Sequence, residues 1–405
     1  MKSGSTFLLA ARQCEIAELR QLARTCELVA VIARLIHALQ RERGISNIFL
    51  GSQGARFAAQ REQQVGQCVE MERGVRAQLE RLKTDPDQVR NGARLFSRIA
   101  LVLYGLDDLP VLRADIAQRE VTASDATAVF GKLIAGLLAI VFEAADSAGD
   151  PEISRALVAM FNFMQGKEFA GQERTFGGRV FAAGFIDRAG QQQWRHLVES
   201  QRACFETFAA FCARALRRAE ASMRDAGIDQ EIEQLRRVGG RVGGELDPEL
   251  SDRWCHVCTS RIDVMKALED MATSHLRDLC ERRIAQAQTE LRDQRALLQA
   301  LASQAQADTG GPAALGPHLE RSVLMLLQEQ SRRLQTMDDE LDAVRATLQE
   351  RKVVERAKGV IMANHRMSED EAYKALRETA MNQKRRLVDV AQSVLALADV
   401  LPANR

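Results

Sequence analysis

Residues that break helices are rare in this chain. It has only seven prolines in 405 residues, and a proline inside a helix removes a backbone hydrogen bond and clashes with the preceding turn. The long intervals between breaks carry apolar residues at helical spacing, without the period-two alternation that indicates strands. Alanine, leucine, glutamine, glutamate and arginine are plentiful, and all five favour helices. These features predict an all-α protein.

The few breaks divide the chain into segments. Motifs containing Pro110 and Pro151 mark helix ends. The clearest boundary is the stretch ADTGGPAALGPH, which cannot continue a helix through two glycines and two prolines. We therefore expect a large helical domain of two packed four-helix bundles at residues 1–306, a linker at 307–318 and a small unit at 319–405.

Charge and hydropathy indicate the cellular compartment of the chain and the partners it can bind. The net charge is +1, so binding to nucleic acid would need a local basic patch. The longest apolar run, Leu133 to Phe142, is shorter than the about 20 residues that span a bilayer, so we expect it to form a buried helix. The first residues lack the apolar region and cleavage site of a signal peptide. We expect a cytoplasmic protein that does not enter a membrane, with its eight cysteines as free thiols.

Sequence motifs of enzymes are lacking. The chain has no glycine-rich phosphate loop and no convincing pair of nucleophile and base. Cys255 and Cys258 have the spacing of a metal or redox motif, but no second pair of metal ligands follows at a suitable distance. We interpret both cysteines as structural residues of a helix, and we expect no metal, no cofactor and no enzymatic activity.

A heptad repeat follows the predicted linker. Its first row is formed by Leu327, Leu334, Leu341 and Leu348. Its second row, offset by three and four residues, is formed by Val323, Gln330, Met337 and Val344. Two such rows make an apolar seam along one side of a helix, as in coiled coils. Packing of this helix on its own domain is the alternative, and we favour a homodimer joined through the seam.

The end of the chain is basic. Between Arg351 and Arg386 there are ten basic and five acidic residues, a net charge of +5. Three apolar helical faces, interrupted at ANHR and at MNQK, predict a small three-helix bundle after the coiled-coil helix. A positive patch on such a bundle is typical of proteins that contact phosphate groups. A solvated surface without a partner is the alternative.

The same region resembles the ANTAR domain, an RNA-binding module of transcription antitermination. The resemblance covers roughly the last 60 residues and rests on the motifs ERAKGVIM and SEDEAYKALRETAMNQKRRLVDVA. ANTAR domains bind paired hairpin loops in leader RNA and prevent a terminator from forming. The resemblance therefore implies leader mRNA hairpins, and not DNA, as the partner.

Several side chains of the basic bundle are candidates for RNA contact. Lys358 and Arg377 can reach phosphates or a purine edge, and Gly359 allows a close approach. Tyr373, on the same helical face as Arg377, can stack on a loop base or pack inside the bundle. The full set is Lys358, Gly359, Arg366, Tyr373, Arg377, Lys384 and Arg385. A helix-turn-helix fits less well, because the basic residues are spread over three short helices.

Two similar motifs in the large domain place arginines among apolar residues. QRERGISNIFL contains Arg43, and GQERTFGGRVF contains Arg174. Burying an unpaired arginine costs free energy, so one explanation is an ion pair with the neighbouring Glu42 or Glu173.

A binding site for a small anion is the second explanation, and the one we favour. A guanidinium presents a planar pair of donors that matches a planar oxyanion, which lysine does less well. Small residues in both motifs would let an anion approach closely: Gly44, Ser46, Gly177 and Gly178.

The large domain resembles the NIT domain, a helical module that senses nitrate and nitrite, over about residues 30–290. The resemblance rests on the ERG-S motif, on the second Glu-Arg pair and on the segment from LRRVGG to RWCHVCTSRID. It implies nitrate or nitrite as effector, bound by Arg43, Arg174, Arg236 and Ser46. Arg237 is an alternative to its neighbour Arg236. The second motif has Thr175 where the first has Gly44, so the roles of the two halves can differ.

Together the two resemblances imply a nitrate-responsive transcription antiterminator. Such a protein is a non-enzymatic RNA-binding regulator that permits read-through of a nitrate-assimilation operon. The alternative is a helical signalling receptor whose basic C-terminal bundle contacts a protein partner. An enzyme fits the sequence least.

Overall fold

The computed structural model describes residues 4–82, 92–307, 317–365, 367 and 369–400. These residues form helices and contain no strand, so the predicted all-α fold is confirmed. In chain order the helices are α1 (Gly4–Gly51), α2 (Ala58–Glu80), α3 (Gly92–Asp107), α4 (Leu109–Gln118), α5 (Ala123–Ser147), α6 (Pro151–Ala183), α7 (Arg188–Phe211), α8 (Arg214–Met223), α9 (Ala226–Gly239), α10 (Leu250–Ala307), α11 (Pro317–His365), α12 (Glu369–Gln383) and α13 (Leu387–Val400). They form two compact units, Met1–Glu329 and Gln330–Arg405.

Helices begin where the sequence supplies capping residues. The carboxylate of Asp150 accepts a hydrogen bond from the backbone N of Ile153 at 3.1 Å, and Pro151 is the first residue of α6. Proline is tolerated there because the first helical N–H groups have no partner within the helix. Pro110 lies in the first turn of α4. The helix ends predicted around Pro110 and Pro151 are therefore confirmed.

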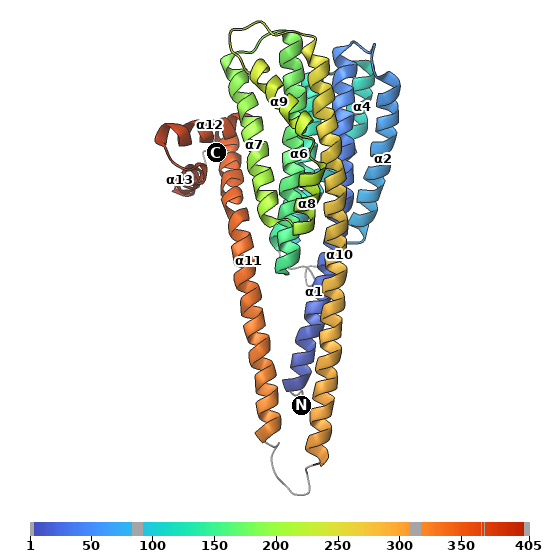
Figure 1. The fold of residues 1–405 in the computed structure, drawn as a ribbon, viewed down its shortest axis with the longest axis vertical. Helices are drawn as coiled ribbons and strands as arrows, with labels where there is room; N and C mark the ends of the chain where they lie inside the picture. Colours follow the sequence, from blue (N-terminus) through green and yellow to red (C-terminus); the bar gives the residue numbers. More distant parts are fainter. Residues whose placement is uncertain (1–3, 83–91, 308–316, 366, 368, 401–405) are drawn as a thin grey trace. The chain divides into compact units, whose positions relative to one another are not determined.

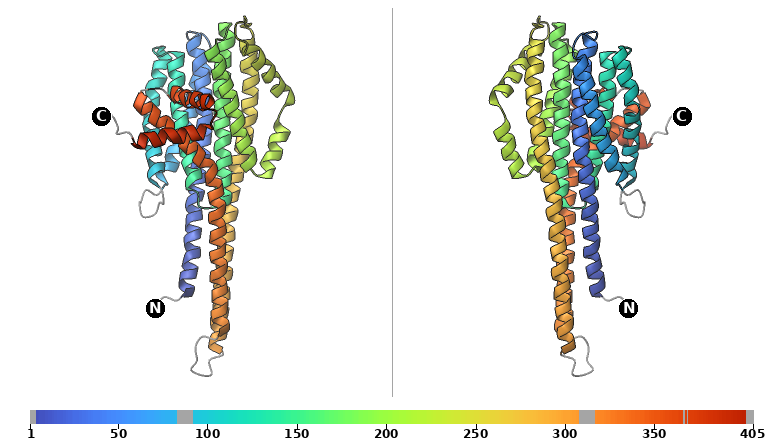
Figure 2. Two further views of the ribbon diagram at one scale, coloured as in Figure 1. Left: turned by 90° about the vertical axis from the view of Figure 1, so that its left-hand side faces the viewer. Right: turned by 90° about the vertical axis from the view of Figure 1, so that its right-hand side faces the viewer.

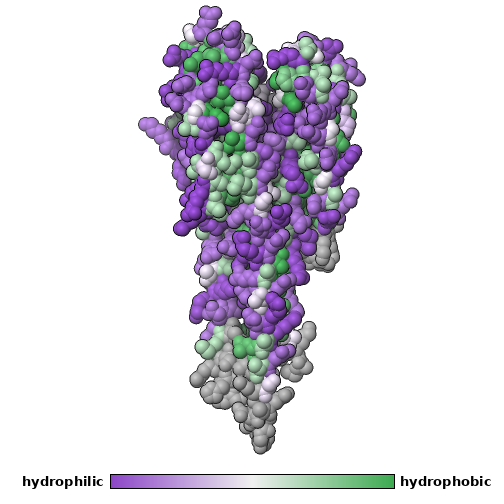
Figure 3. Space-filling view, turned by 45° about the vertical axis from the view of Figure 1, so that its right-hand side comes forward, coloured by the Kyte–Doolittle hydropathy of each residue, from purple (hydrophilic) through white to green (hydrophobic). Residues whose placement is uncertain are grey.

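The first unit contains two groups of packed helices, shown in Figures 1 and 2. In the first group α2 and α5 pack on α1, and α3 packs on α5. In the second group α7 and α10 pack on α6, and α9 packs on α10. Contacts of α1 with α10 and α6, and of α5 with α6, join the groups. Polar residues dominate the face shown in Figure 3, with apolar side chains in patches.

Helix α5 contains the apolar run identified in the sequence. By length and composition alone, α5 could cross a membrane. In the structure it packs on α1, α3 and α6. Its buried residues include Leu133, Ile134, Leu137, Leu138, Ile140 and Val141. The run thus lies in the core of the helical unit.

The second unit contains the predicted three-helix bundle. Its core joins Ala357 of α11, Leu376 of α12 and Val390 of α13. The first of the three helices is not a separate short element, because α11 continues without interruption from Pro317 to His365. Residues 308–316 of the predicted linker lie outside the described residues, and the predicted domain limits remain predictions.

Candidate anion site and basic bundle

Arg43 of α1 and Arg174 of α6 lie close together where the two helices meet. A Cβ atom added to Gly44 would lie 2.7 Å from Nη2 of Arg174. A Cβ atom added to Gly171 would lie 3.2 Å from Nη2 of Arg43. Each guanidinium thus lies against a glycine of the opposite helix, and the structure brings together the two arginines that the sequence motifs singled out.

Arg43 is paired with a buried carboxylate. Its Nη1 lies 2.5 Å from Oε1 of Glu168 and its Nη2 lies 3.2 Å from Oε2. Both side chains are only 3% exposed. The amides of Gln40 and Gln172 donate to the same carboxylate, at 2.8 and 2.9 Å. Glu168 therefore accepts four hydrogen bonds and is held firmly in place.

The alternative ion pair between Arg43 and Glu42 does not form. The Glu42 carboxylate accepts two hydrogen bonds from Arg113 of α4, both at 2.8 Å. Glu173, the acidic neighbour of Arg174, is likewise paired with Arg236 of α9. Both alternative partners are thus engaged elsewhere.

Arg174 has a polar partner but no counter-ion. Its Nη1 donates to Oγ1 of Thr259 on α10 at 3.1 Å. In the part of the chain that the structure describes, no carboxylate oxygen lies within 4 Å of its guanidinium. Burial, followed by the charge of Arg43, lowers the pKa of Arg174. Arginine nevertheless stays protonated in proteins, so Arg174 carries a positive charge that no described carboxylate pairs with directly. The carboxylate of Asp263 favours this charge from a longer distance.

Two thiols lie on the α10 face near Arg174. Burial raises the pKa of Cys255 and of Cys258, so both are neutral thiols near neutral pH. All eight cysteines of the chain are free. Among the described residues, no group of three or more His, Cys, Asp or Glu side chains could hold a metal ion.

Arg236 belongs to a neighbouring polar cluster. Its Nε and Nη2 donate to the two carboxylate oxygens of Glu173 at 2.7 and 2.6 Å. Trp194 and Gln201 donate to the same carboxylate, at 2.9 and 2.6 Å. Burial alone would raise the pKa of Glu173, but these donors, Arg236 foremost, hold it below its ordinary value. Nη1 of Arg236 donates to Glu233 at 2.7 Å, so its guanidinium is engaged by two carboxylates.

The small residues predicted to approach an anion have different environments. Ser46 is 2% exposed, and among the described residues its hydroxyl makes no hydrogen bond with Arg43 or Arg174. A Cβ atom on Gly177 would lie 2.5 Å from the indole of Trp254, and one on Gly178 would lie 3.1 Å from Sγ of Cys255. The expectation that Gly177 and Gly178 face an anion is wrong, because α10 covers them.

Sequence reasoning missed Glu168 and Thr259. Glu168 follows Lys167 in α6, where 22 of the 33 helix residues are buried. Charged residues in such a helix almost always have a partner when buried, and that was the available signal. Thr259 gave none, because hydroxyl residues in helices commonly bond only to the preceding turn.

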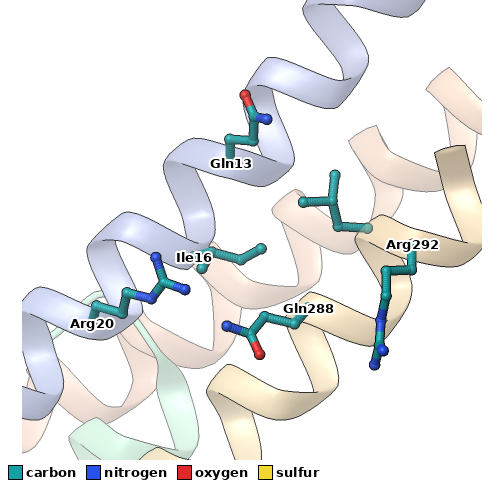
Figure 4. Close-up of a pocket in the computed structure, with 6 residues that line it drawn as sticks. Gln13, Ile16, Arg20, Gln288 and Arg292 are labelled. Atoms are coloured by element: carbon teal, nitrogen blue, oxygen red, sulfur yellow. The ribbon is translucent and has the colours of Figure 1, made fainter.

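A separate hollow lies between α1 and α10, and Figure 4 shows it. Gln13, Ile16 and Arg20 line it from α1, and Gln288, Leu291 and Arg292 line it from α10. Arg20 precedes Arg43 by about six helical turns. The hollow is therefore distinct from the paired arginines.

The described residues that we predict to contact RNA lie on α11, on α12 and in the turn between α12 and α13. Lys358 is 8% exposed, and its Nζ lies 5.8 Å from the ring centroid of Tyr373, within range of a cation–π contact. Gly359 is exposed, and a Cβ atom there would meet nothing within 4 Å. Arg377 is half-buried. Arg366 lies outside the described residues.

The turn between α12 and α13 presents two further basic candidates. Lys384 and Arg385 are both exposed. Arg385 donates to the carbonyl oxygen of Asp389 at 3.2 Å and to Oγ of Ser393 at 3.1 Å. These two hydrogen bonds hold its guanidinium on the surface of α13.

A helical unit with two adjacent arginines is thus followed by a small bundle with exposed basic residues. Residues 34–277 match the NIT family, described as nitrate and nitrite sensing. This match spans more than half of the chain, so the chain belongs to the NIT family. Residues 342–395 match the ANTAR domain. Both predicted resemblances are confirmed.

Two relatives cover almost the whole chain. The nitrate regulatory protein of Klebsiella oxytoca is 33% identical over 392 residues, which are 96% of this chain and 93% of that protein. The solved structure of the NasR transcription antiterminator is 32% identical and superposes with a TM-score of 0.62. That comparison covers 98% of this chain and 99% of the other. The similarity therefore extends across both units.

Proposed function

We propose that this protein is a nitrate- or nitrite-responsive antitermination regulator of the cytoplasm, without enzymatic activity. It binds hairpins in leader mRNA and permits read-through of a nitrate-assimilation operon. The NIT and ANTAR matches and the similarity to an antiterminator support this proposal. The observation that carries it is the half-buried guanidinium of Arg174, which lies beside Arg43 and forms no ion pair among the described residues.

The effector site in this proposal comprises Arg43, Arg174, Arg236 and Ser46. Arg174 supplies the positive charge that attracts the anion, and Arg43 adds a second guanidinium beside it. Arg236 and Glu173 tie α9 to α6 next to Arg174. A bound anion that draws the two arginines together would pull on α1 and α6, the helices that carry them.

Calorimetric titration of the full chain with sodium nitrate and sodium nitrite tests this site. Arg174→Ala should abolish binding, and Arg43→Lys should weaken it because lysine keeps the charge but loses the planar pair of donors. The control is Arg253→Ala, since Arg253 is exposed and its one ion pair among the described residues is with Glu231. Equal affinity of Arg174→Ala and the parent protein would exclude this site.

The RNA-binding surface in this proposal comprises Lys358, Gly359, Arg366, Tyr373, Arg377, Lys384 and Arg385. Exposed cations at the α12–α13 turn are suited to phosphate contact, which makes affinity salt-dependent. In gel-shift titrations with a leader hairpin, Lys384→Ala should lower the affinity and reduce the salt slope by about one. Lys374→Ala is the control, because Lys374 lies in the same bundle beside Glu378. Absence of hairpin binding under every ligand condition would favour a protein partner instead.

A homodimer through the α11 seam completes the proposal. Leu327 is 43% exposed and Leu334 is 52% exposed, although both occupy apolar positions of the heptad repeat. The side chain of Val323 lies outside the described residues. Leu334→Glu should place like charges in the seam and shift sedimentation toward the monomer, whereas the neighbouring Gln335→Glu should leave it unchanged.

A further inference from the structure

Buried charges in the first unit are almost all neutralised within the protein. Arg43 pairs with Glu168, Arg113 with Glu42, and Lys167 with Glu269. Arg236 pairs with Glu173, and Arg283 pairs with Asp150. Arg61 has no carboxylate partner among the described residues, but its guanidinium lies 5.1 Å from the ring centroid of Phe49 and donates to the carbonyl oxygen of Arg113. Among the described residues, Arg174 has neither a carboxylate within 4 Å nor an aromatic ring beside its guanidinium.

The charge around Arg174 can be counted. Arg43 and Arg174 contribute two positive charges, and Glu168 contributes one negative charge. The adjacent pairs, Lys167 with Glu269 and Arg236 with Glu173, contribute no net charge. The nearby thiols are neutral because burial raises their pKa. Asp263 also acts on Arg174, but from beyond ion-pair distance. Counted over the hydrogen-bonded and ion-paired groups, the cluster therefore has a net charge of +1, which is costly in a partly buried site and is cancelled by a single negative charge.

The carboxylate of Glu168 is held in this cluster by its hydrogen bonds, so an anion does not easily displace it. It accepts two hydrogen bonds from Arg43, one from Gln40 and one from Gln172. Removing the partners of a buried charge is strongly destabilising. An incoming anion is thus added beside Glu168 and does not replace it.

We propose that Glu168 sets the charge selectivity of the anion site, so that the site takes a small monovalent oxyanion and rejects a divalent one. A monovalent anion brings the cluster to neutrality. A divalent anion, such as sulfate, would leave a net negative charge between α1 and α6, next to the carboxylate of Glu168. The inference rests on the proposed function, because it names the class of ligand for the same site.

Glu168→Gln tests this role, since it removes the charge with little change in shape. Binding of sodium nitrate and sodium sulfate is measured by calorimetry on the full chain, at constant ionic strength and chloride concentration. The parent protein should bind nitrate and not sulfate. In Glu168→Gln the cluster has a net charge of +2, so the preference for nitrate over sulfate should fall on the order of tenfold or more.

Two further variants separate charge from structure. Glu42→Gln removes a buried carboxylate of similar exposure, paired with Arg113, and should leave the selectivity unchanged. Glu168→Asp keeps the charge on a shorter side chain and should still reject sulfate, which keeps the proposal testable if Glu168→Gln does not fold. Thermal unfolding of each variant reports whether it is folded.

The outcomes distinguish the two proposals. A parent protein that binds neither nitrate nor nitrite contradicts the proposed function. A parent that binds nitrate, with an unchanged preference in folded Glu168→Gln, overturns the inference and leaves the function intact. Acceptance of sulfate by Glu168→Asp overturns it as well.

Discussion

Lys167 of α6 and Glu269 of α10 form an ion pair in which both side chains are 0% exposed. The Nζ atom of Lys167 lies 2.7 and 2.6 Å from the two carboxylate oxygens of Glu269. Lys266 approaches the same carboxylate at 3.3 Å. The pair joins the two longest helices of the second helical group, and Lys167 directly precedes Glu168, the partner of Arg43.

Removing one member of this pair should destabilise the fold. Lys167→Met leaves the Glu269 carboxylate buried without its principal partner, so the free energy of unfolding should fall by about 3–5 kcal/mol. Lys266 compensates in part and favours the lower end of that range. Urea denaturation followed by circular dichroism measures the change. The double variant Lys167→Met/Glu269→Leu should regain most of the stability, and a double variant no more stable than the single one would contradict this account.

Gly44→Ala should separate stability from anion binding. The new Cβ atom would lie 2.7 Å from Nη2 of Arg174, which is the end of a flexible side chain and can move. Alanine also stabilises a helix interior relative to glycine by about 0.5–1 kcal/mol. The melting temperature should therefore stay equal or rise, while nitrate affinity in calorimetry falls. A loss of both properties would show that Gly44 is needed for packing.

Gly177→Ala should have the opposite consequence for stability. Its Cβ atom would lie 2.5 Å from the ring of Trp254, which is fully buried and donates from Nε1 to the carbonyl oxygen of Arg174. Overpacking a core in this way costs about 1–3 kcal/mol. Gly74→Ala is the matched control in α2, since a Cβ there meets nothing within 4 Å and should stabilise the helix. Denaturation of both variants under the same conditions gives the comparison.

His37 should make stability depend on pH in the acid range. Burial, together with the charges of Lys167, Lys266, Arg41 and Arg174, lowers its pKa from 6.5 to about 3. Because the folded protein binds this proton less readily than the unfolded chain, the contribution is complete above pH 6.5 and is lost as the pH falls toward 3. The slope from this one group is at most about 1.4 kcal/mol per pH unit.

His37→Gln should flatten the stability profile in that window. The control is His256→Gln, because His256 is exposed on the same unit. Denaturation midpoints measured from pH 7 to pH 4 provide the test. An identical acid slope in the parent and in His37→Gln would assign the pH dependence to other groups.

Helix starts could be predicted from the local sequence, but ion pairs between residues far apart in the chain could not. Asp150 and Pro151 fix the start of α6 by themselves, so the break was predictable. The partner of Arg43 was not, because Glu168 lies 125 residues away and meets it only through the packing of α1 on α6. The neighbouring Glu42 was a poor candidate for a physical reason. Consecutive helical residues point about 100° apart, and Glu42 faces Arg113.

The C-terminal unit shows the same division. Its three apolar faces follow from periodicity and the bundle core confirms them. The sequence predicts three separate short helices. In the structure no residue between Pro317 and His365 ends a helix, so α11 contains both the heptad repeat and the first helix of the bundle. The contact of Lys358 with Tyr373 was not expected either, because it joins two helices whose packing the sequence does not specify.

Three ion pairs fix α6 on different sides. Lys167, Glu168 and Glu173 bind partners on α10, α1 and α9, and each pair includes a carboxylate that is 3% exposed or less. A single substitution at any of these positions leaves a buried charge without its partner. Selection should therefore act against proteins in which only one member of a pair has changed. Among relatives of this chain we therefore expect coordinated replacement, in which both members of a pair change together or neither does. The position pairs to compare are 43 with 168, 167 with 269, and 173 with 236.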